Sequence, residues 1–294
     1  MDIIYKQGWL WGLLTALILS FHEATGKYLT QYLSPLEITC FVALAVGVII
    51  LGLRQAVPVM EKRAQLSKGW WVRLLVGTVF SSGAFLLFYY GLKHGTVTET
   101  VLISQLEAAF TAFFGFLFFR EKLSPLQSAR LALALMGAAV FTTNLSFQFT
   151  KASIALLAAA AAWGFTNLIY KSLTHEADAM LLTGMRYLLG GVIIAPLLLG
   201  REIHLAGAAW GWLLLNALVL GLGMVCLFEA MRNYKNTAAA TIWYLPAAIG
   251  SSVVGAIFFG DRLSLLQVFA ACTIIIGVVL VIQYDNQSAP YLPK

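Results

Sequence analysis

The sequence predicts an all-α polytopic membrane protein with ten transmembrane helices in two inverted five-helix repeats. The first reason is composition, because 60% of the 294 residues are hydrophobic and only 11% are charged, whereas soluble domains contain about 25% charged residues. The second is a series of long apolar runs separated by short polar segments. The third is a charged segment that recurs in the second half of the chain.

A helix that spans the bilayer needs about 20 mostly apolar residues. Short breaks such as Ser34-Pro35 and Ser124-Pro125 divide the chain into runs of roughly that length. Because most connections are only a few residues long, we expect consecutive helices to be antiparallel neighbours. The predicted spans are 8–28, 36–53, 70–92, 96–118, 125–147, 153–172, 180–199, 208–230, 237–259 and 264–284.

The segment 118–127 (FFREKLSPLQ) returns as 258–267 (FFGDRLSLLQ), 140 residues later. Each copy is a charged elbow between two apolar runs, with Glu121-Lys122 in the first and Asp261-Arg262 in the second. Duplicating an odd number of spans places the second copy upside down relative to the first, and inverted repeats are common in transporters. The expected division is a first five-helix repeat over 1–148, a second, inverted repeat over 149–286 and a polar C-terminal tail over 287–294.

Lysine and arginine residues lie mainly in the loops on one side of the predicted membrane, above all in the loop of residues 54–69. Cytoplasmic loops carry this excess. We therefore expect a multi-pass protein of the cytoplasmic (inner) membrane with cytoplasmic N- and C-termini. The first apolar run is too long for the apolar core of a signal peptide, so it is expected to be the first span.

The charge pattern and the reactive residues favour no enzymatic or nucleic-acid-binding class. The net charge of +6 comes from short loops between apolar runs, which indicates membrane topology and no nucleic-acid partner. The three cysteines are far apart in apolar runs and lack the spacing of metal ligands. The chain shows no Ser/His/Asp set and no phosphate-binding glycine loop. We expect no enzyme activity, no cofactor and no metal.

Several motifs resemble the EamA-like branch of the drug/metabolite transporter superfamily. Trp163-Gly164-Phe165-Thr166-Asn167, with Lys171 after it, resembles the sixth helix of that family, and Leu106 to Phe110 followed by 119–124 resembles its fourth helix and elbow. Two positions depart from the pattern. Val42 stands where the family often has an arginine, and Ala108 where a proline is common. The resemblance implies a ten-helix transporter of small metabolites, often an amino-acid exporter.

Glu107 is the first candidate functional residue. It lies halfway along the fourth predicted span, where a charged side chain costs about 2.5–3.5 kcal/mol and usually faces a cavity or a partner. Thr100, Ser104 and Thr111 recur at helical spacing with Glu107 and form one polar stripe. Either Glu107 lines a substrate cavity, where it is also our candidate for coupling to an ion or proton, or it is protonated or hydrogen-bonded between helices as a packing group.

Other polar and aromatic residues inside the spans are further candidates. Glu23 and Lys27 are four residues apart, so they either neutralise each other or contribute to a cavity. Arg186 either binds a substrate carboxylate or forms an inter-helix pair. Asn167 occupies the position of Glu23 in the second repeat, 144 residues later. The aromatic candidates, which either line a cavity for an amphipathic substrate or pack against helices and lipid, are Trp163, Trp243 and Tyr244.

Together these features predict a secondary transporter that works by alternating access, with its two halves rocking around a cavity lined by the first, third, fourth, sixth, eighth and ninth spans. The expected partners are a small-molecule solute, most simply an amino acid or a related amphipathic compound for export, and the lipid bilayer. A second hypothesis is a facilitator or importer of a vitamin-like or cationic solute bound by Glu107 and Glu23. A third is a non-transporting membrane accessory protein. Monomer and homodimer both remain open.

Overall fold

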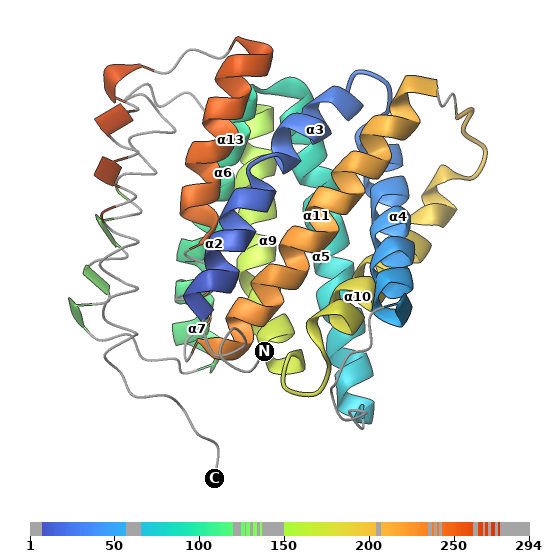
Figure 1. Ribbon diagram of the computed structural model, residues 1–294, viewed down its shortest axis with the longest axis horizontal. Coiled ribbons are helices and arrows are strands. Elements are labelled where there is room, and N and C mark those ends of the chain that lie inside the picture. The colour runs from blue at the N-terminus through green and yellow to red at the C-terminus, as the bar shows by residue number, and fades with distance from the viewer. Residues whose placement is uncertain are drawn as a thin grey trace.

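The computed structural model describes residues 8–56, 66–119, 150–203, 207–234 and 243–260, with separate residues between 125 and 136, at 237 and 240, and between 264 and 276. The elements in these ranges are helices, packed side by side in a bundle (Figure 1). The elbows at Glu121-Lys122 and Asp261-Arg262, most of the fifth span of each repeat and the tail 287–294 lie outside the described residues.

Five of the described helices are long and apolar enough to cross a membrane. They confirm the all-α polytopic fold, and a count of ten spans stays a prediction. The described elements are α2 (Gly8–Leu19), α3 (His22–Leu29), α4 (Pro35–Ala56), α5 (Lys68–His94), α6 (Val97–Ser104), α7 (Leu106–Phe119), α9 (Lys151–Leu173), α10 (Ala179–Ile194), the 3-10 turn η1 (Ala195–Leu198), α11 (Gly207–Asn233) and α13 (Tyr244–Phe259).

Two spans predicted as continuous helices are broken, so that prediction was wrong in detail. The first span divides into α2 and α3 at Ser20-Phe21, and the fourth into α6 and α7 at Gln105. At each break a polar side chain bonds the carbonyl four residues back: Ser20 Oγ donates to the Ala16 carbonyl at 2.7 Å, and Gln105 Nε2 to the Val101 carbonyl at 3.2 Å. Such bonds offer the backbone an alternative to regular helix and often bend it.

The ninth predicted span also differs from the expectation. The described helix α13 begins at Tyr244, with Trp243 as its N-terminal cap residue. Pro246 therefore lies in the first turn, where the backbone N–H has no partner within the helix in any case. The proline favours a helix start at this position rather than a kink in the helix interior.

The closest helix pairs combine the two repeats. α4 packs along α10, and α5 packs along α9. Gly47 on α4 permits this approach, because a Cβ at that position would lie 2.7 Å from the backbone nitrogen of Leu188 on α10. Small residues are the usual device for close helix contacts in membranes, where lipid removes the hydrophobic drive between helices.

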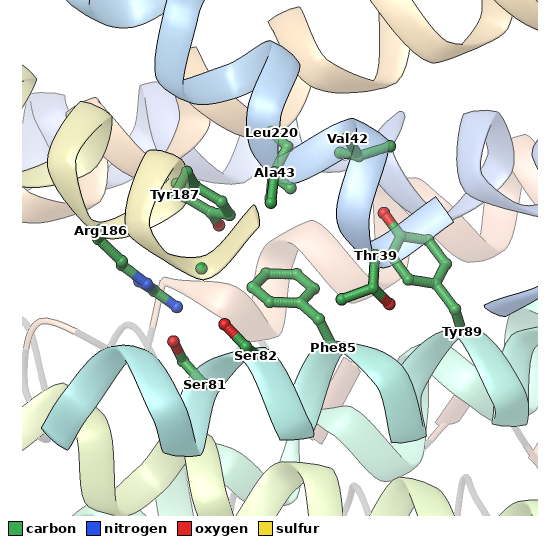
Figure 2. Close-up of a pocket in the computed structure, with 11 residues that line it drawn as sticks. Thr39, Val42, Ala43, Ser81, Ser82, Phe85, Tyr89, Arg186, Tyr187 and Leu220 are labelled. Atoms are coloured by element: carbon green, nitrogen blue, oxygen red, sulfur yellow. The ribbon is translucent and has the colours of Figure 1, made fainter. Parts of the chain in front are cut away.

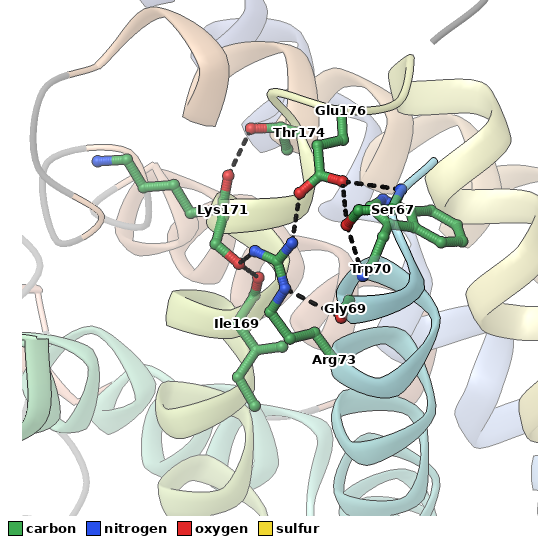
Figure 3. Close-up of polar contacts among 9 residues, drawn as sticks. Ser67, Gly69, Trp70, Arg73, Ile169, Lys171, Thr174 and Glu176 are labelled. Carbon is green, nitrogen blue, oxygen red and sulfur yellow. Dashed lines mark hydrogen bonds and ion pairs between the residues drawn. The ribbon is translucent and has the colours of Figure 1, made fainter. Parts of the chain in front are cut away.

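Ion pairs connect the helices of each pair at one end of the bundle. Arg54 at the end of α4 forms a forked ion pair with Asp178, the N-cap of α10, with an Nη2–Oδ2 distance of 2.8 Å. Figure 3 shows the corresponding contacts of α5 and α9, where Arg73 pairs with Glu176. Ser67 Oγ accepts from the Trp70 backbone N–H and donates to Glu176 at 2.8 Å. The segment between α9 and α10 therefore contacts both the end of α4 and the start of α5 at one end of the bundle.

Candidate functional site

A cavity of about 50 Å³ lies between helices of both repeats. Residues of seven predicted spans line it. Six of these are the spans expected to line the cavity, and the seventh is the span that contains α10. The lining residues are Leu19, His22, Glu23, Phe85, Phe88, Ser104, Gln105, Glu107, Trp163, Asn167, Arg186, Leu220, Met224, Tyr244 and Ala247.

Glu107 reaches this cavity because the fourth span breaks just before it. The break places Glu107 in the first turn of α7, where the free backbone N–H groups and the helix dipole favour a negative charge. The side chain is only 6% exposed, and Oε1 accepts a 2.6 Å hydrogen bond from Asn167 Nδ2 on α9. Asn167 Nδ2 also lies 3.4 Å from Thr111 Oγ1. The acid is therefore bonded by a neutral residue of the other repeat.

Glu23 has the same local setting at the other broken helix. It lies in the first turn of α3, directly after the break at Ser20-Phe21. Its Oε2 accepts a 2.7 Å hydrogen bond from Ser251 Oγ on α13. Each of the two acids in the cavity thus follows a helix break and bonds a polar, uncharged side chain across the repeats.

The contacts around the acids repeat with the internal offsets of the sequence. Gly250 packs on Ser20, with a Cβ at Gly250 placed 2.7 Å from Ser20 Cβ. The equivalent of Ser20 is Gly164, at an offset of 144, and the equivalent of Gly250 is Phe110, at an offset of 140. A Cβ at Gly164 would lie 2.6 Å from Phe110 Cβ. The Glu23–Ser251 contact likewise corresponds to Asn167 with Thr111. These paired crossings agree with an inverted-repeat fold.

Arg186 provides a buried cation in the wall of the cavity. The residue is 3% exposed, and its guanidinium carbon lies 4.3 Å from the ring centre of Tyr170 and 5.1 Å from that of Tyr187. The rings of Phe85 and Phe228 lie slightly further away, at 5.9 and 5.8 Å. Aromatic faces stabilise a cation electrostatically, so these rings help to hold the charge inside the bundle.

A second cavity, of about 10 Å³, adjoins the first and shares Phe85, Arg186 and Leu220 with it. Figure 2 shows Arg186 extending from α10 towards α5, where Ser81 and Ser82 lie. Val42 on α4 also lines this smaller cavity. Arg186 therefore lies at the junction of the two spaces.

Aromatic rings form another part of the wall of the larger cavity. Trp163 lies 5.0 Å from Phe85 and 5.3 Å from Phe88, measured between ring centres. His22 stacks on Phe88 at 5.6 Å. Asn216 Nδ2 lies 3.1 Å from His22 Nδ1 and fixes the imidazole from α11. The site thus combines two acids, an arginine and a histidine with a flat apolar wall.

The structure brings together seven of the residues singled out in the sequence: Glu23, Ser104, Glu107, Trp163, Asn167, Arg186 and Tyr244. The other four do not line the cavity. Thr100 and Thr111 are buried and donate to backbone carbonyls of their own helices. Lys27 Nζ donates to the carbonyls of Leu92 and Gly95 at the end of α5. Trp243 Nε1 donates to Tyr234 at 3.0 Å.

Eight lining residues were not expected from the sequence: Leu19, His22, Phe85, Phe88, Gln105, Leu220, Met224 and Ala247. Gln105 and His22 had a usable signal, because both are polar within apolar spans, Gln105 next to Ser104 and His22 next to Glu23. The apolar residues gave none. In the described part of the chain no group of three or more His, Cys, Asp or Glu side chains is placed to hold a metal ion.

Comparisons with known proteins agree with this architecture. A protein of Methanothermobacter thermautotrophicus described as an uncharacterized transporter is 23% identical over 92% of this chain and 86% of its own length. One of Clostridium kluyveri with the same description is 21% identical over 94% of this chain and 93% of its own length. A solved crystal structure, 17% identical, has a TM-score of 0.75 over 95% of this chain and 97% of its own.

The family comparison covers nearly the whole chain. The model of the EamA-like transporter family matches residues 6–143 and again residues 150–283. The two matches are of similar length and lie one after the other. The chain therefore belongs to the EamA-like transporter family, and it is a multi-pass membrane transporter.

Proposed function

We propose that the protein is a secondary transporter that exports amino acids or related amphipathic metabolites by alternating access through the cavity between its repeats. The observation that carries the proposal is the position of Glu107. An acid buried between the repeats is rare in membrane proteins and typical of solute and ion pathways. Family membership supports transport, and the cavity supports the solute class.

The lining of the cavity suits a small molecule that carries both charge signs and an apolar part. Glu23 and Glu107 supply acceptors for an ammonium group, and Arg186 supplies donors for an acid group. Phe85, Phe88 and Trp163 supply an apolar surface. A solute with only one charge would leave one of these groups without a counterpart, so a zwitterion fits better than a simple cation or anion.

Glu107 is the proposed coupling group. Its hydrogen bond from Asn167 runs to a carboxyl oxygen that accepts in both the ionised and the protonated acid. Protonation therefore need not break the contact between α7 and α9. A proton taken up on one side of the membrane and released on the other would change the charge of the cavity while the local packing is kept.

The test is flux measured in proteoliposomes that contain the purified full chain. Preloaded vesicles exchange labelled amino acids with the medium, and empty vesicles serve as the control. Amino acids are expected to compete with one another, and quaternary amines are not. Absence of flux for every solute of the panel would contradict the proposal and support the non-transporting alternative.

A second candidate function is the uptake or facilitated diffusion of a vitamin-like or cationic solute. The observation that favours it is the pair of acids, Glu23 and Glu107, which line the cavity with one permanently charged cation, Arg186. Competition again separates the candidates, because a cation carrier is inhibited by quaternary amines and is insensitive to amino acids. Vesicles of known sidedness then distinguish export from import.

We further propose that the protein lies in the cytoplasmic membrane with both termini in the cytoplasm. The contacts of Arg54 with Asp178 and of Arg73 with Glu176 support placing the end of α4, the start of α5 and the segment between α9 and α10 on the same side of the membrane. The test labels single cysteines at the two ends of α5 after Cys272→Ser, since Cys272 is exposed. Lys93→Cys should react with an impermeant thiol reagent in intact cells, and Lys68→Cys only after permeabilisation. The reverse pattern would invert the topology.

A further inference from the structure

Two of the hydrogen-bond donors of Arg186 have no acceptor in the part of the chain that the structure describes. Its Nε and Nη1 are buried and have no hydrogen-bond partner among the described residues. A buried donor without an acceptor is costly, and a buried charge more so. Membrane proteins usually pair such a cation with an acid or with backbone carbonyls. The unused donors therefore require an explanation beyond packing.

The aromatic neighbours explain the burial of the cation but leave its donors free. Tyr170, Tyr187, Phe85 and Phe228 present their rings to the guanidinium carbon at 4.3–5.9 Å. A ring face interacts with a guanidinium above or below its plane, whereas the N–H groups lie within that plane. Nε and Nη1 lie on different edges of the guanidinium, and each of these edges also carries Nη2, so either edge can present two parallel donors to the two oxygens of a carboxylate.

The rest of the cavity supplies two more unused polar groups. Trp163 Nε1, a donor, and Gln105 Oε1, an acceptor, are buried without a partner among the described residues. Both residues line the larger cavity together with Arg186 and the two acids. The unused donors and the unused acceptor fit a ligand with both an acid end and an amino end.

We propose that Arg186 binds the carboxylate of an α-amino acid in the plane of its guanidinium, with the ligand's ammonium group on the side of Gln105 and Glu107. This inference rests on the proposed transport of amino acids and adds the orientation of the substrate. At about 50 Å³ the cavity is well below the roughly 300 Å³ of small ligand pockets. The surrounding helices must therefore separate to admit any but the smallest side chain.

The experiment measures binding of two matched ligand series to the purified full chain by thermal shift, since a ligand of the folded state raises its apparent stability. One series is alanine, alaninamide and ethylamine, and the other is phenylalanine, phenylalaninamide and phenethylamine. We expect each acid to bind about tenfold to a hundredfold more tightly than its amide, which is the range of a charge-assisted hydrogen bond. Equal binding of acid and amide would overturn the inference, even if no variant folds.

Variants then assign the acid preference to Arg186. Arg186→Gln should reduce the ratio of acid to amide affinity to about one, and Arg186→Lys should retain part of it, because a lysine keeps the charge without the fork. Lys68→Gln, which removes an exposed charge at the start of α5, should leave the ratio unchanged. An unchanged ratio in Arg186→Gln would overturn the inference, and the guanidinium would then be a packing group.

The flux assay separates this failure from failure of the proposed function. If labelled amino acids are exchanged in proteoliposomes but Arg186→Gln keeps its preference for the acid, only the orientation proposed here is wrong. If the unaltered chain neither binds nor exchanges any amino acid of the two series, both proposals fail.

Discussion

The two repeats meet at two equivalent crossings, one where the break between α2 and α3 contacts α13 and one where α7 contacts α9. The packing is alike, since Gly250 on Ser20 corresponds to Gly164 on Phe110. The chemistry differs, because Glu23 with Ser251 at the first crossing corresponds to Asn167 with Thr111 at the second. The comparison teaches that the contact geometry follows the duplication, whereas the charges do not.

Two further unmatched charges, Glu107 and Arg186, line the cavity. The position equivalent to Glu107 is Ala247, at an offset of 140, and the position equivalent to Arg186 is Val42, at an offset of 144. Each of these four residues lines one of the two adjoining cavities. A fold with inverted repeats can present nearly equal surfaces to the two sides of the membrane, so departures from symmetry of this kind mark where the two halves have separate roles.

The largest expected effect comes from Glu107→Gln, which makes the two halves more alike by removing one of the two unmatched acids of the cavity. Uptake into proteoliposomes should lose its dependence on pH, because the coupling group no longer titrates. The Gln carbonyl still accepts from Asn167, so stability should change by less than about 1 kcal/mol. Glu23→Gln, which alters the other acid of the same cavity, is the matched control and should keep the pH dependence. Unchanged pH dependence in Glu107→Gln would remove its coupling role.

The next effect tests the equivalence of the crossings. Gly250→Ala forces a Cβ against Ser20 and should destabilise the protein by about 1–3 kcal/mol, as overpacking of a tight contact does. Adding Ser20→Gly moves the glycine to the other helix, as at Gly164 and Phe110, and should restore much of the loss. The measurement is unfolding in detergent.

Gly83→Ala is the control for this test, because a Cβ at Gly83 meets no atom within 4 Å. Alanine is preferred to glycine in a helix by about 0.5–1 kcal/mol, so this variant should be neutral or slightly more stable. A Gly250→Ala variant that unfolds together with wild type would show that the crossing is not tightly packed.

A smaller effect is expected at Lys27, which caps the end of α5. Its Nζ donates to the carbonyls of Leu92 and Gly95 at 2.7 and 2.6 Å. Lys27→Met should lower stability by about 1 kcal/mol, since it removes two hydrogen bonds and a favourable charge at a helix C-terminus. Lys93→Met, at an exposed position of the same helix end, should have less effect. If Lys27→Met instead alters substrate affinity, the cavity interpretation of Lys27 would be restored.

The smallest effect concerns Glu176, in the loop outside the membrane. Burial alone would raise the pKa of its carboxyl, but hydrogen bonds from Ser67 and Arg73 outweigh burial and lower that pKa below its ordinary value of 4.5. The stabilisation is therefore complete above about pH 4.5 and is lost as pH falls through the lowered pKa. In Glu176→Gln this acid-dependent loss, at most about 1 kcal/mol for an exposed pair, should disappear from thermal unfolding curves. If wild type and Glu176→Gln lose the same stability as the pH falls, the loss arises from other groups.

The sequence predicted the long spans closely because an apolar run of fixed length is a strong signal. Span 153–172 corresponds to α9 (Lys151–Leu173), and span 208–230 to α11 (Gly207–Asn233). The breaks at Ser20 and Gln105 escaped prediction, because neither position carries the proline or glycine that usually marks one. At each break a polar side chain bonds the carbonyl four residues back, but Thr111 makes the same bond in an unbroken helix, so such a residue does not mark a break in the sequence.

Most of the polar part of the candidate site was predictable, although Gln105 and His22 were missed. Glu23, Glu107, Asn167 and Arg186 stand out because polar groups are rare inside apolar spans. The aromatic wall was not predictable, since a phenylalanine such as Phe85 is compatible with a cavity, a helix contact and lipid alike. In a membrane both faces of a helix are apolar, so the pattern that reveals the inner face of a soluble helix is lost.

The close contact of α4 with α10 has a consequence for motion. α4 belongs to the first repeat and α10 to the second, yet Gly47 and Leu188 interlock them along their length and Arg54 and Asp178 fasten their ends. Pulling one repeat away from the other would break these contacts. Under the proposed alternating access, we therefore expect the moving bodies to combine helices from both repeats, with the breaks at Ser20-Phe21 and at Gln105 as candidate hinges.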